Sequence, residues 1–118
     1  MKAIFASFIA ALFSFIATDK LTGRWESKSE KGNITGVVFK ENNSFEGYIN
    51  KKPFVTGTYS YSSEDSIFVF TDNGCNGQTG TYKINFYANG DSLRFKAIID
   101  SCAERKAVME RLIMGRVK

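Results

Sequence analysis

Histidine is absent from this chain of 118 residues, while proline and tryptophan occur once each and cysteine occurs twice. Without an imidazole the protein has no histidine base, no histidine metal ligand and no Ser-His triad. Nearly all carboxylates fall in predicted turns or on predicted solvent-facing positions, as Glu64-Asp65 does. We therefore predict a protein that is not an enzyme and that uses neither a metal nor a cofactor.

Charge of one sign is never concentrated along the chain. The formal net charge is +4, and no run of like charges is longer than a pair such as Lys51-Lys52. Proteins that bind nucleic acids carry a basic stripe or patch. We therefore expect no nucleic-acid partner.

The only long apolar run lies at the N-terminus. Lys2 precedes an apolar stretch, Ala3–Ala17, that only two serines interrupt. At about 15 residues this stretch is shorter than the ~20 residues that span a bilayer. A basic residue before a short apolar run is typical of a secretory signal peptide. We predict that residues 1–17 are this signal and that residues 18–118 form a secreted or periplasmic domain without stable membrane insertion; an uncleaved anchor is the alternative.

The two cysteines, Cys75 and Cys102, both lie in the predicted exported part, where thiols meet an oxidising environment. Two cysteines allow one pairing, and we predict a disulfide between them. Closing this loop should stabilise the fold by roughly 3–4 kcal/mol. A metal pair would need further ligands, and a redox site more often shows Cys-x-x-Cys spacing.

Apolar residues alternate with polar ones between turn-rich clusters that recur about every ten residues, as in antiparallel barrels and sandwiches. We therefore predict an all-β fold, a small antiparallel up-and-down barrel of about eight strands, with a two-sheet sandwich as the alternative. The predicted inward positions are Val37 and Phe39; Phe45, Gly47 and Ile49; Gly57, Tyr59 and Tyr61; Phe68 and Phe70; Gly80, Tyr82, Ile84 and Phe86; and Leu93, Phe95 and Ala97.

One hairpin pattern occurs twice. Gly57-Thr58-Tyr59 and Gly80-Thr81-Tyr82 are each followed by a polar turn and a second apolar strand. The glycine marks either a close backbone approach or a bend. Near the C-terminus, Ala103–Leu112 consists of helix formers, so we predict a short helix there and a last strand near Ile113–Val117. The alternative is that the helical segment belongs to the strand.

A motif at the start of the predicted domain carries a family resemblance. Gly23-Arg24-Trp25, ahead of the predicted strands, resembles the start of a lipocalin (calycin superfamily) barrel. The resemblance implies that Trp25 packs across the bottom of the barrel. It also implies that a basic residue near the last strand covers the indole ring, and the candidates are Arg105, Arg111 and Arg116.

The segments around the two cysteines are similar to those of small secreted bacterial lipocalin-like domains. One segment joins Asp72-Asn73-Gly74-Cys75 to Gly80-Thr81-Tyr82, and the other is Asp100-Ser101-Cys102-Ala103-Glu104-Arg105. This chain is shorter than a typical lipocalin and lacks a clear long C-terminal helix. The resemblance implies that a small hydrophobic molecule binds inside the barrel.

Eight aromatic residues are candidates for the lining of the barrel interior. An eight-stranded barrel is just wide enough either to be filled by its side chains or to hold one small ligand. A filled barrel would instead act on a protein partner, as an inhibitor or interaction module, through loops such as Asn42–Ser44, Lys51–Phe54 or Asp72–Gly77. The eight candidates are Phe39, Phe45, Tyr59, Phe68, Phe70, Tyr82, Phe86 and Phe95.

Two polar segments allow more than one interpretation. Asp72–Gly77 has a weak likeness to a calcium loop but lacks the acidic twelfth residue, so we expect a tight turn with glycine at positive φ. Asp100 and Arg105 flank Cys102. We expect Asp100 to cap the helical turn at Ala103 and Arg105 to pack on the tryptophan, with an ion pair at a binding site as the alternative.

Overall fold

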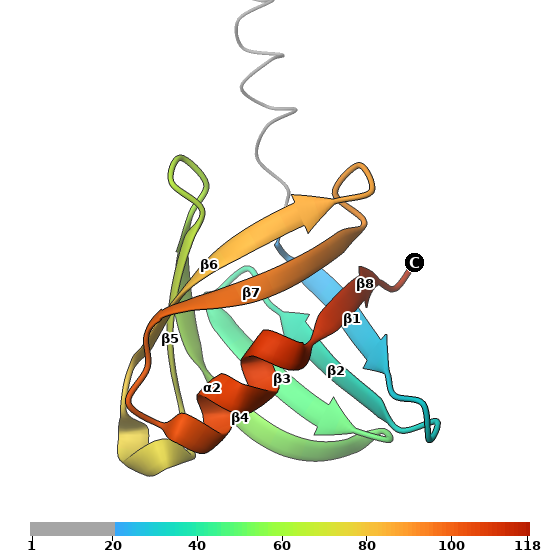
Figure 1. The fold of residues 1–118 in the computed structure, drawn as a ribbon, viewed down its shortest axis with the longest axis horizontal. Helices are drawn as coiled ribbons and strands as arrows, with labels where there is room; N and C mark the ends of the chain where they lie inside the picture. Colours follow the sequence, from blue (N-terminus) through green and yellow to red (C-terminus); the bar gives the residue numbers. More distant parts are fainter. Residues whose placement is uncertain (1–20) are drawn as a thin grey trace, which may run out of the picture.

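The computed structural model describes residues 21–118, and the predicted signal peptide lies outside this range. The described residues form one closed barrel of eight antiparallel strands (Figure 1). In this part of the chain no helix is long and apolar enough to cross a membrane. The barrel prediction is confirmed, the sandwich is excluded, and the architecture agrees with the fold that the lipocalin resemblance implies.

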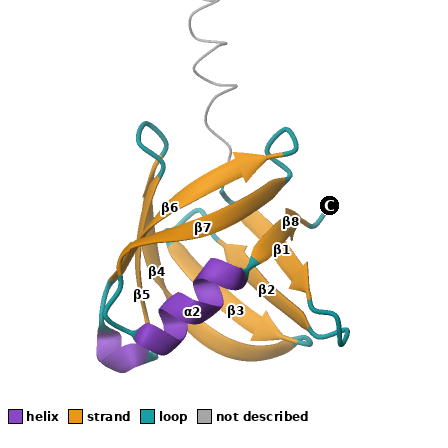
Figure 2. Ribbon diagram, in the orientation of Figure 1, coloured by secondary structure: helices purple, strands orange, loops and turns teal. Residues whose placement is uncertain are grey.

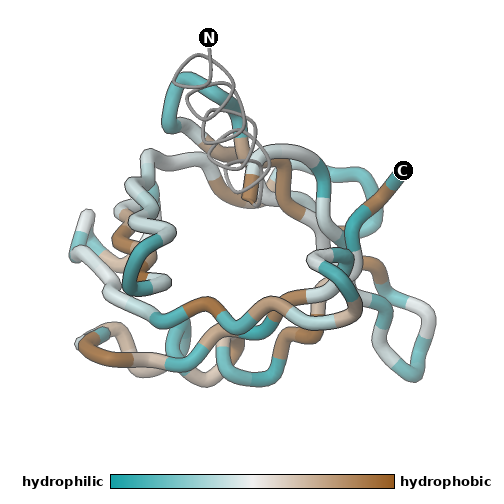
Figure 3. Tube along the Cα trace, turned by 90° about the horizontal axis from the view of Figure 1, so that it is seen from above, coloured by the Kyte–Doolittle hydropathy of each residue, from teal (hydrophilic) through white to brown (hydrophobic). Residues whose placement is uncertain are grey.

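Each strand pairs with the next along the chain, and β1 also pairs with β8, so the sheet closes on itself. Up-and-down closure of this kind protects the edges of a small sheet. Figure 3 shows the resulting ring of backbone. The strands are β1 Gly23–Lys28, β2 Ile34–Phe39, β3 Ser44–Ile49, β4 Lys52–Ser62, β5 Ile67–Asp72, β6 Gly80–Tyr87, β7 Ser92–Ile99 and β8 Ile113–Arg116.

The predicted alternation places the aromatic residues on the inner face. Tyr59 pairs with Phe70 across β4 and β5, and Phe68 pairs with Tyr82 across β5 and β6. Ile49, which we predicted on a buried face, is 37% exposed because it is the last residue of β3, beside a hairpin turn. The buried core is Leu21, Trp25, Phe39, Phe45, Phe68, Phe70, Tyr82, Ile84, Leu93, Phe95 and Met114.

Both glycines of the repeated hairpin mark close approaches. A Cβ atom at Gly57 would lie 2.1 Å from the carbonyl oxygen of Thr71. A Cβ atom at Gly80 would lie 3.0 Å from a carboxylate oxygen of Asp100. Of the two interpretations of the Gly-Thr-Tyr pattern, the structure therefore supports the close approach at each position.

The predicted helix is α2 (Ala103–Arg111), which packs beside β7 and leads into β8 (Figure 2). Along β7, strand β8 pairs only with Ser92–Arg94, so within residues 21–118 the rest of that β7 edge has no strand partner. Helix α2 lies along it, and the N–H group of Ala97 donates a hydrogen bond of 3.2 Å to the Glu110 carboxylate. A helix thus completes the barrel where the last strand is too short.

Candidate functional site

The barrel holds a cavity of about 670 Å³, which is within the usual range of small-molecule sites, about 300–1,000 Å³. Residues of β2, β3, β4, β5, β7, β8 and α2, with the loop after β5, contribute to its wall. Most of that wall is apolar, and its apolar side chains are those of Val37, Phe39, Phe45, Phe54, Val55, Phe68, Phe70, Phe95, Val108, Met109, Leu112 and Met114.

Five of the eight predicted interior residues line this cavity: Phe39, Phe45, Phe68, Phe70 and Phe95. Phe39 and Phe68 form its floor, because each also contacts the ring of Tyr59 beyond it, at 5.1 and 5.9 Å between centroids.

The structure places the other three predicted residues outside the cavity. Tyr59 lies on the far side of the floor and donates a hydrogen bond to the carbonyl oxygen of Lys40. The ring of Phe86 packs on that of Trp25, with 6.1 Å between the ring centroids. Tyr82 is fully buried behind the wall and donates to the Asp100 carboxylate. We call the part beyond the floor the closed end; it contains Trp25, Tyr59, Tyr61, Phe86 and Leu93.

Trp25 is fully buried in the closed end. Its Nε1 donates a hydrogen bond of 2.8 Å to the carbonyl oxygen of Leu21, and the Arg116 guanidinium lies 4.3 Å from its ring centroid. Of the three arginines that the resemblance offered, Arg116 covers the indole, whereas Arg111 is exposed and Arg105 packs elsewhere. The closed end is thus filled by rings and sealed by a cation–π contact.

One face of α2 forms a side of the cavity. Arg105, Val108, Met109 and Leu112 all line it, and their spacing of three and four residues puts them on one face of the helix. The sequence indicated this helix but not its place over the hollow part of the barrel. Val108, Met109 and Leu112 were missed as site residues, since alternation within strands does not show where a helix docks. Val37, Val55 and Met114 were missed as well.

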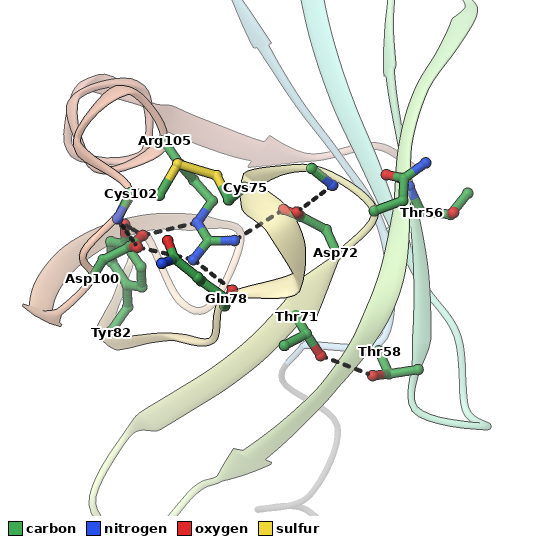
Figure 4. Close-up of polar contacts among 12 residues, drawn as sticks. Thr56, Thr58, Thr71, Asp72, Cys75, Gln78, Tyr82, Asp100, Cys102 and Arg105 are labelled. Atoms are coloured by element: carbon green, nitrogen blue, oxygen red, sulfur yellow. Dashed lines mark hydrogen bonds and ion pairs between the residues drawn. A yellow bond between two sulfur atoms is a disulfide. The ribbon is translucent and has the colours of Figure 1, made fainter.

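Arg105 forms a buried ion-pair network in the cavity wall (Figure 4). Its Nε and Nη2 groups donate to the two carboxylate oxygens of Asp100, both at 2.9 Å. Nη2 also donates to the carbonyl oxygen of Gln78 at 2.9 Å, and Nη1 lies 3.4 Å from the carboxylate of Asp72. The side chain of Asp100 is fully buried, and those of Arg105 and Asp72 are 8% exposed.

The expected roles of Asp100 and Arg105 were wrong. The two residues form an ion pair, as in the alternative that we gave, and its place at a binding site stays a prediction. Arg105 stacks on Phe70, 4.8 Å from its ring centroid, because it lies at the start of α2 and not near the last strand. Asp100 accepts a hydrogen bond from the N–H group of Cys102, and Cys102 itself occupies the N-cap of α2.

The network favours the charged forms of Asp100 and Arg105 and the neutral form of Tyr82. Burial would raise the pKa of Asp100, but hydrogen bonds from Arg105, Tyr82 and the Cys102 N–H outweigh it, and the pKa is lowered. The hydrogen bond to Asp100 raises the pKa of Arg105. Burial, and then the neighbouring Asp100 carboxylate, raise the pKa of Tyr82, which therefore stays a hydrogen-bond donor.

The predicted disulfide between Cys75 and Cys102 is present, with Cα atoms 5.9 Å apart. It joins the loop after β5, which contains the short 3-10 helix η1 (Cys75–Gly77), to the start of α2. Both cysteines line the cavity. The bond therefore ties two sides of the cavity wall together.

The loop after β5 is a tight turn, with Gly77 at φ 72°. Within residues 21–118 no group of three Cys, Asp or Glu side chains is placed to hold a metal ion.

Comparison of the chain with protein-family models, with curated proteins and with solved structures found no match.

Proposed function

We propose that this protein is an exported, lipocalin-like carrier that binds a small hydrophobic molecule in the barrel cavity and catalyses no reaction on it. The observation that carries the proposal is the cavity of about 670 Å³, lined mainly by phenylalanine and aliphatic side chains. Burying apolar ligand surface there would contribute about 25 cal/mol per Å² removed from water.

The walls of the cavity favour binding because they are already in place. Phe45 and Phe70 contact each other edge to face, and Phe68 and Phe95 lie 5.7 Å apart between ring centroids. The disulfide fixes the loop after β5 against α2. A preformed site loses less conformational entropy when a ligand binds.

Export is supported by two independent features. The predicted signal peptide occupies residues 1–17, and disulfides persist mainly in oxidising compartments. The same compartment suits a carrier of poorly soluble molecules, which has to take up and release its ligand outside the cytoplasm. We therefore propose a secreted or periplasmic location.

Native mass spectrometry of the mature protein tests the proposal directly. We expect an added non-covalent mass after gentle purification, or after incubation with dodecanol, and its loss after organic extraction. In the Val37→Phe variant the new ring would occupy the cavity, since Val37 lines it. That variant should bind dodecanol at least about tenfold more weakly, which corresponds to roughly 1.4 kcal/mol.

The matched control is Val38→Phe, the same change on the adjacent residue of β2. Val38 points to the other side of the sheet and does not line the cavity. This variant should bind dodecanol as the wild type does. If the wild type stays free of ligand with dodecanol and with a panel of other apolar compounds, the proposal is wrong.

An exposed ring near the β3–β4 turn favours a second candidate, a contact with a protein partner. Of the loop that we predicted over Lys51–Phe54, the residues from Lys52 onward belong to β4. Phe54 is 70% exposed at the rim of the cavity. Loops on a rigid scaffold often carry contacts. A Phe54→Ser variant that loses a partner captured by the wild type, yet still binds dodecanol, would support this candidate.

A further inference from the structure

Three charged residues line the cavity, and their charges do not balance. They are Asp72, Glu104 and Arg105. Directly behind this wall lies the carboxylate of Asp100, which pairs with Arg105 at 2.9 Å. This side of the cavity therefore has three carboxylates and one guanidinium, and two of the carboxylates, Asp72 and Asp100, contact that guanidinium.

Arg105 offers little to an anionic ligand because four of its five N–H groups already face acceptors of the protein. Nε and Nη2 form a two-pronged contact with Asp100, and Nη2 also donates to the carbonyl oxygen of Gln78. Nη1 faces the carboxylate of Asp72, as Figure 4 shows. The guanidinium is therefore paired with groups of the protein itself, and the Phe70 ring covers one face of the guanidinium.

The negative charge is also held in place. The side chains of Asp72 and Asp100 are 8% and 0% exposed, so water screens them weakly. The hydrogen bonds that Asp100 accepts from Arg105, Tyr82 and the Cys102 N–H keep it ionised. Like charges in a poorly hydrated site repel more strongly than they do in water.

We infer that the cavity selects an apolar ligand with a cationic head group, such as an alkylammonium, over a fatty acid of the same length. The inference rests on the proposed function and names the class of ligand. A carboxylate would add a fourth negative charge beside Asp72 and Asp100, whereas an ammonium would reduce the imbalance. The rings of Phe45 and Phe95 in the wall favour the same choice, because cations bind to aromatic faces.

Three probes with one chain length test this selectivity: dodecyltrimethylammonium, dodecanol and dodecanoate, each titrated calorimetrically below its micelle concentration. We expect dodecyltrimethylammonium to bind best and dodecanoate worst, with at least about a tenfold difference between them. Equal binding of the three, or tighter binding of dodecanoate, would overturn the inference but leave the proposed function standing. If none of the three binds, the proposed function itself fails.

Single substitutions test which carboxylates cause this preference for a cation. Asp72→Asn keeps an oxygen for the Gly74 N–H group, which now donates to Asp72 at 2.9 Å, but removes one charge. It should reduce the preference for the cation over dodecanol several-fold, and Glu104→Gln, an exposed change at the rim, should reduce it less. Asp65→Asn, in the β4–β5 turn, makes the same change of net charge away from the cavity. If Asp65→Asn lowers the preference as much as Asp72→Asn, the charge of the wall is not its source.

Discussion

The two ends of this barrel are built from the same kinds of residue and are stabilised in different ways. In the closed end, Trp25 and Phe86 pack ring against ring under the guanidinium of Arg116. In the other end, which we call the open end, phenylalanines such as Phe45, Phe70 and Phe95 line the cavity of about 670 Å³. What joins the walls of the open end is a disulfide and a buried ion-pair network, both attached to α2.

The difference shows how a small barrel can combine stability with an internal space. Side chains in contact on all sides gain dispersion energy, and a ring that faces a void forfeits part of it. A covalent cross-link stabilises by restricting the unfolded chain, and it needs no filled core beside it. The comparison therefore predicts that substitutions at the two ends affect stability and binding in opposite proportions.

The largest loss of stability is expected from Trp25→Ala in the closed end. The indole is fully buried, and its removal would leave a large void beside Phe86 and Arg116. We expect a decrease of about 3–5 kcal/mol in the free energy of unfolding. Urea unfolding followed by circular dichroism measures it, because the variant lacks the only tryptophan.

The dodecanol affinity of the Trp25→Ala variant completes the comparison of the two ends. Trp25 does not line the cavity, so the folded Trp25→Ala protein should bind dodecanol as the wild type does. A variant that stays within about 1 kcal/mol of the wild type in stability would show that the closed end is not where packing stabilises the barrel. A large loss of dodecanol affinity in the folded variant would show that the two ends are coupled.

The next effect in size is expected in the open end, from Cys75→Ala combined with Cys102→Ala. The disulfide spans a sequence separation of 27, and its removal should cost roughly 3–4 kcal/mol in the chain-entropy model. Dodecanol affinity should fall as well, since the loop after β5 and α2 would no longer be tied together. Thermal unfolding and calorimetric titration measure the two effects.

Reduction of the wild-type protein is the control for the double variant. Both should lose similar stability if the bond, and not the sulfur atoms, is responsible. A double variant as stable as the wild type would mean that the ion-pair network holds the open end by itself.

The barrel was predictable from the sequence because its causes are local. Alternation along each strand places rings such as Phe68 and Phe95 inside, and turn clusters set the strand lengths. The disulfide followed from the presence of only two cysteines. Ile49 is exposed although alternation predicted it on a buried face, because it is the last residue of its strand.

The cavity depends on long-range geometry that alternation does not contain. Whether rings fill a barrel is decided by how far its walls are held apart, and here α2 lies beside β7 where β8 is absent. The hydrogen-bond partners of Arg105 are Asp100, Asp72 and Gln78, which lie up to 33 residues away from it in the sequence. The resemblance offered Arg105 as one of three candidates to cover Trp25; Arg116 covers it, and our expectation that Arg105 packs on Trp25 was wrong.

The smallest expected loss of stability comes from Phe45→Ala, which we compare with Phe68→Ala. Phe68 lies in the floor between the ends and contacts Phe39, Tyr59, Phe70 and Phe95, so its removal should cost about 3–5 kcal/mol. Phe45 contacts two rings, those of Phe39 and Phe70, so its removal should cost roughly 2 kcal/mol, because fewer contacts are lost.

The same pair separates packing from binding. In Phe45→Ala the cavity grows, so a longer alcohol such as hexadecanol should gain affinity relative to dodecanol. Of these two variants, Phe68→Ala should lose more stability, because its ring supports both ends of the barrel. If the two variants lose equal stability and neither changes the preferred chain length, Phe45 is an ordinary core residue and the open end is as closely packed as the closed one.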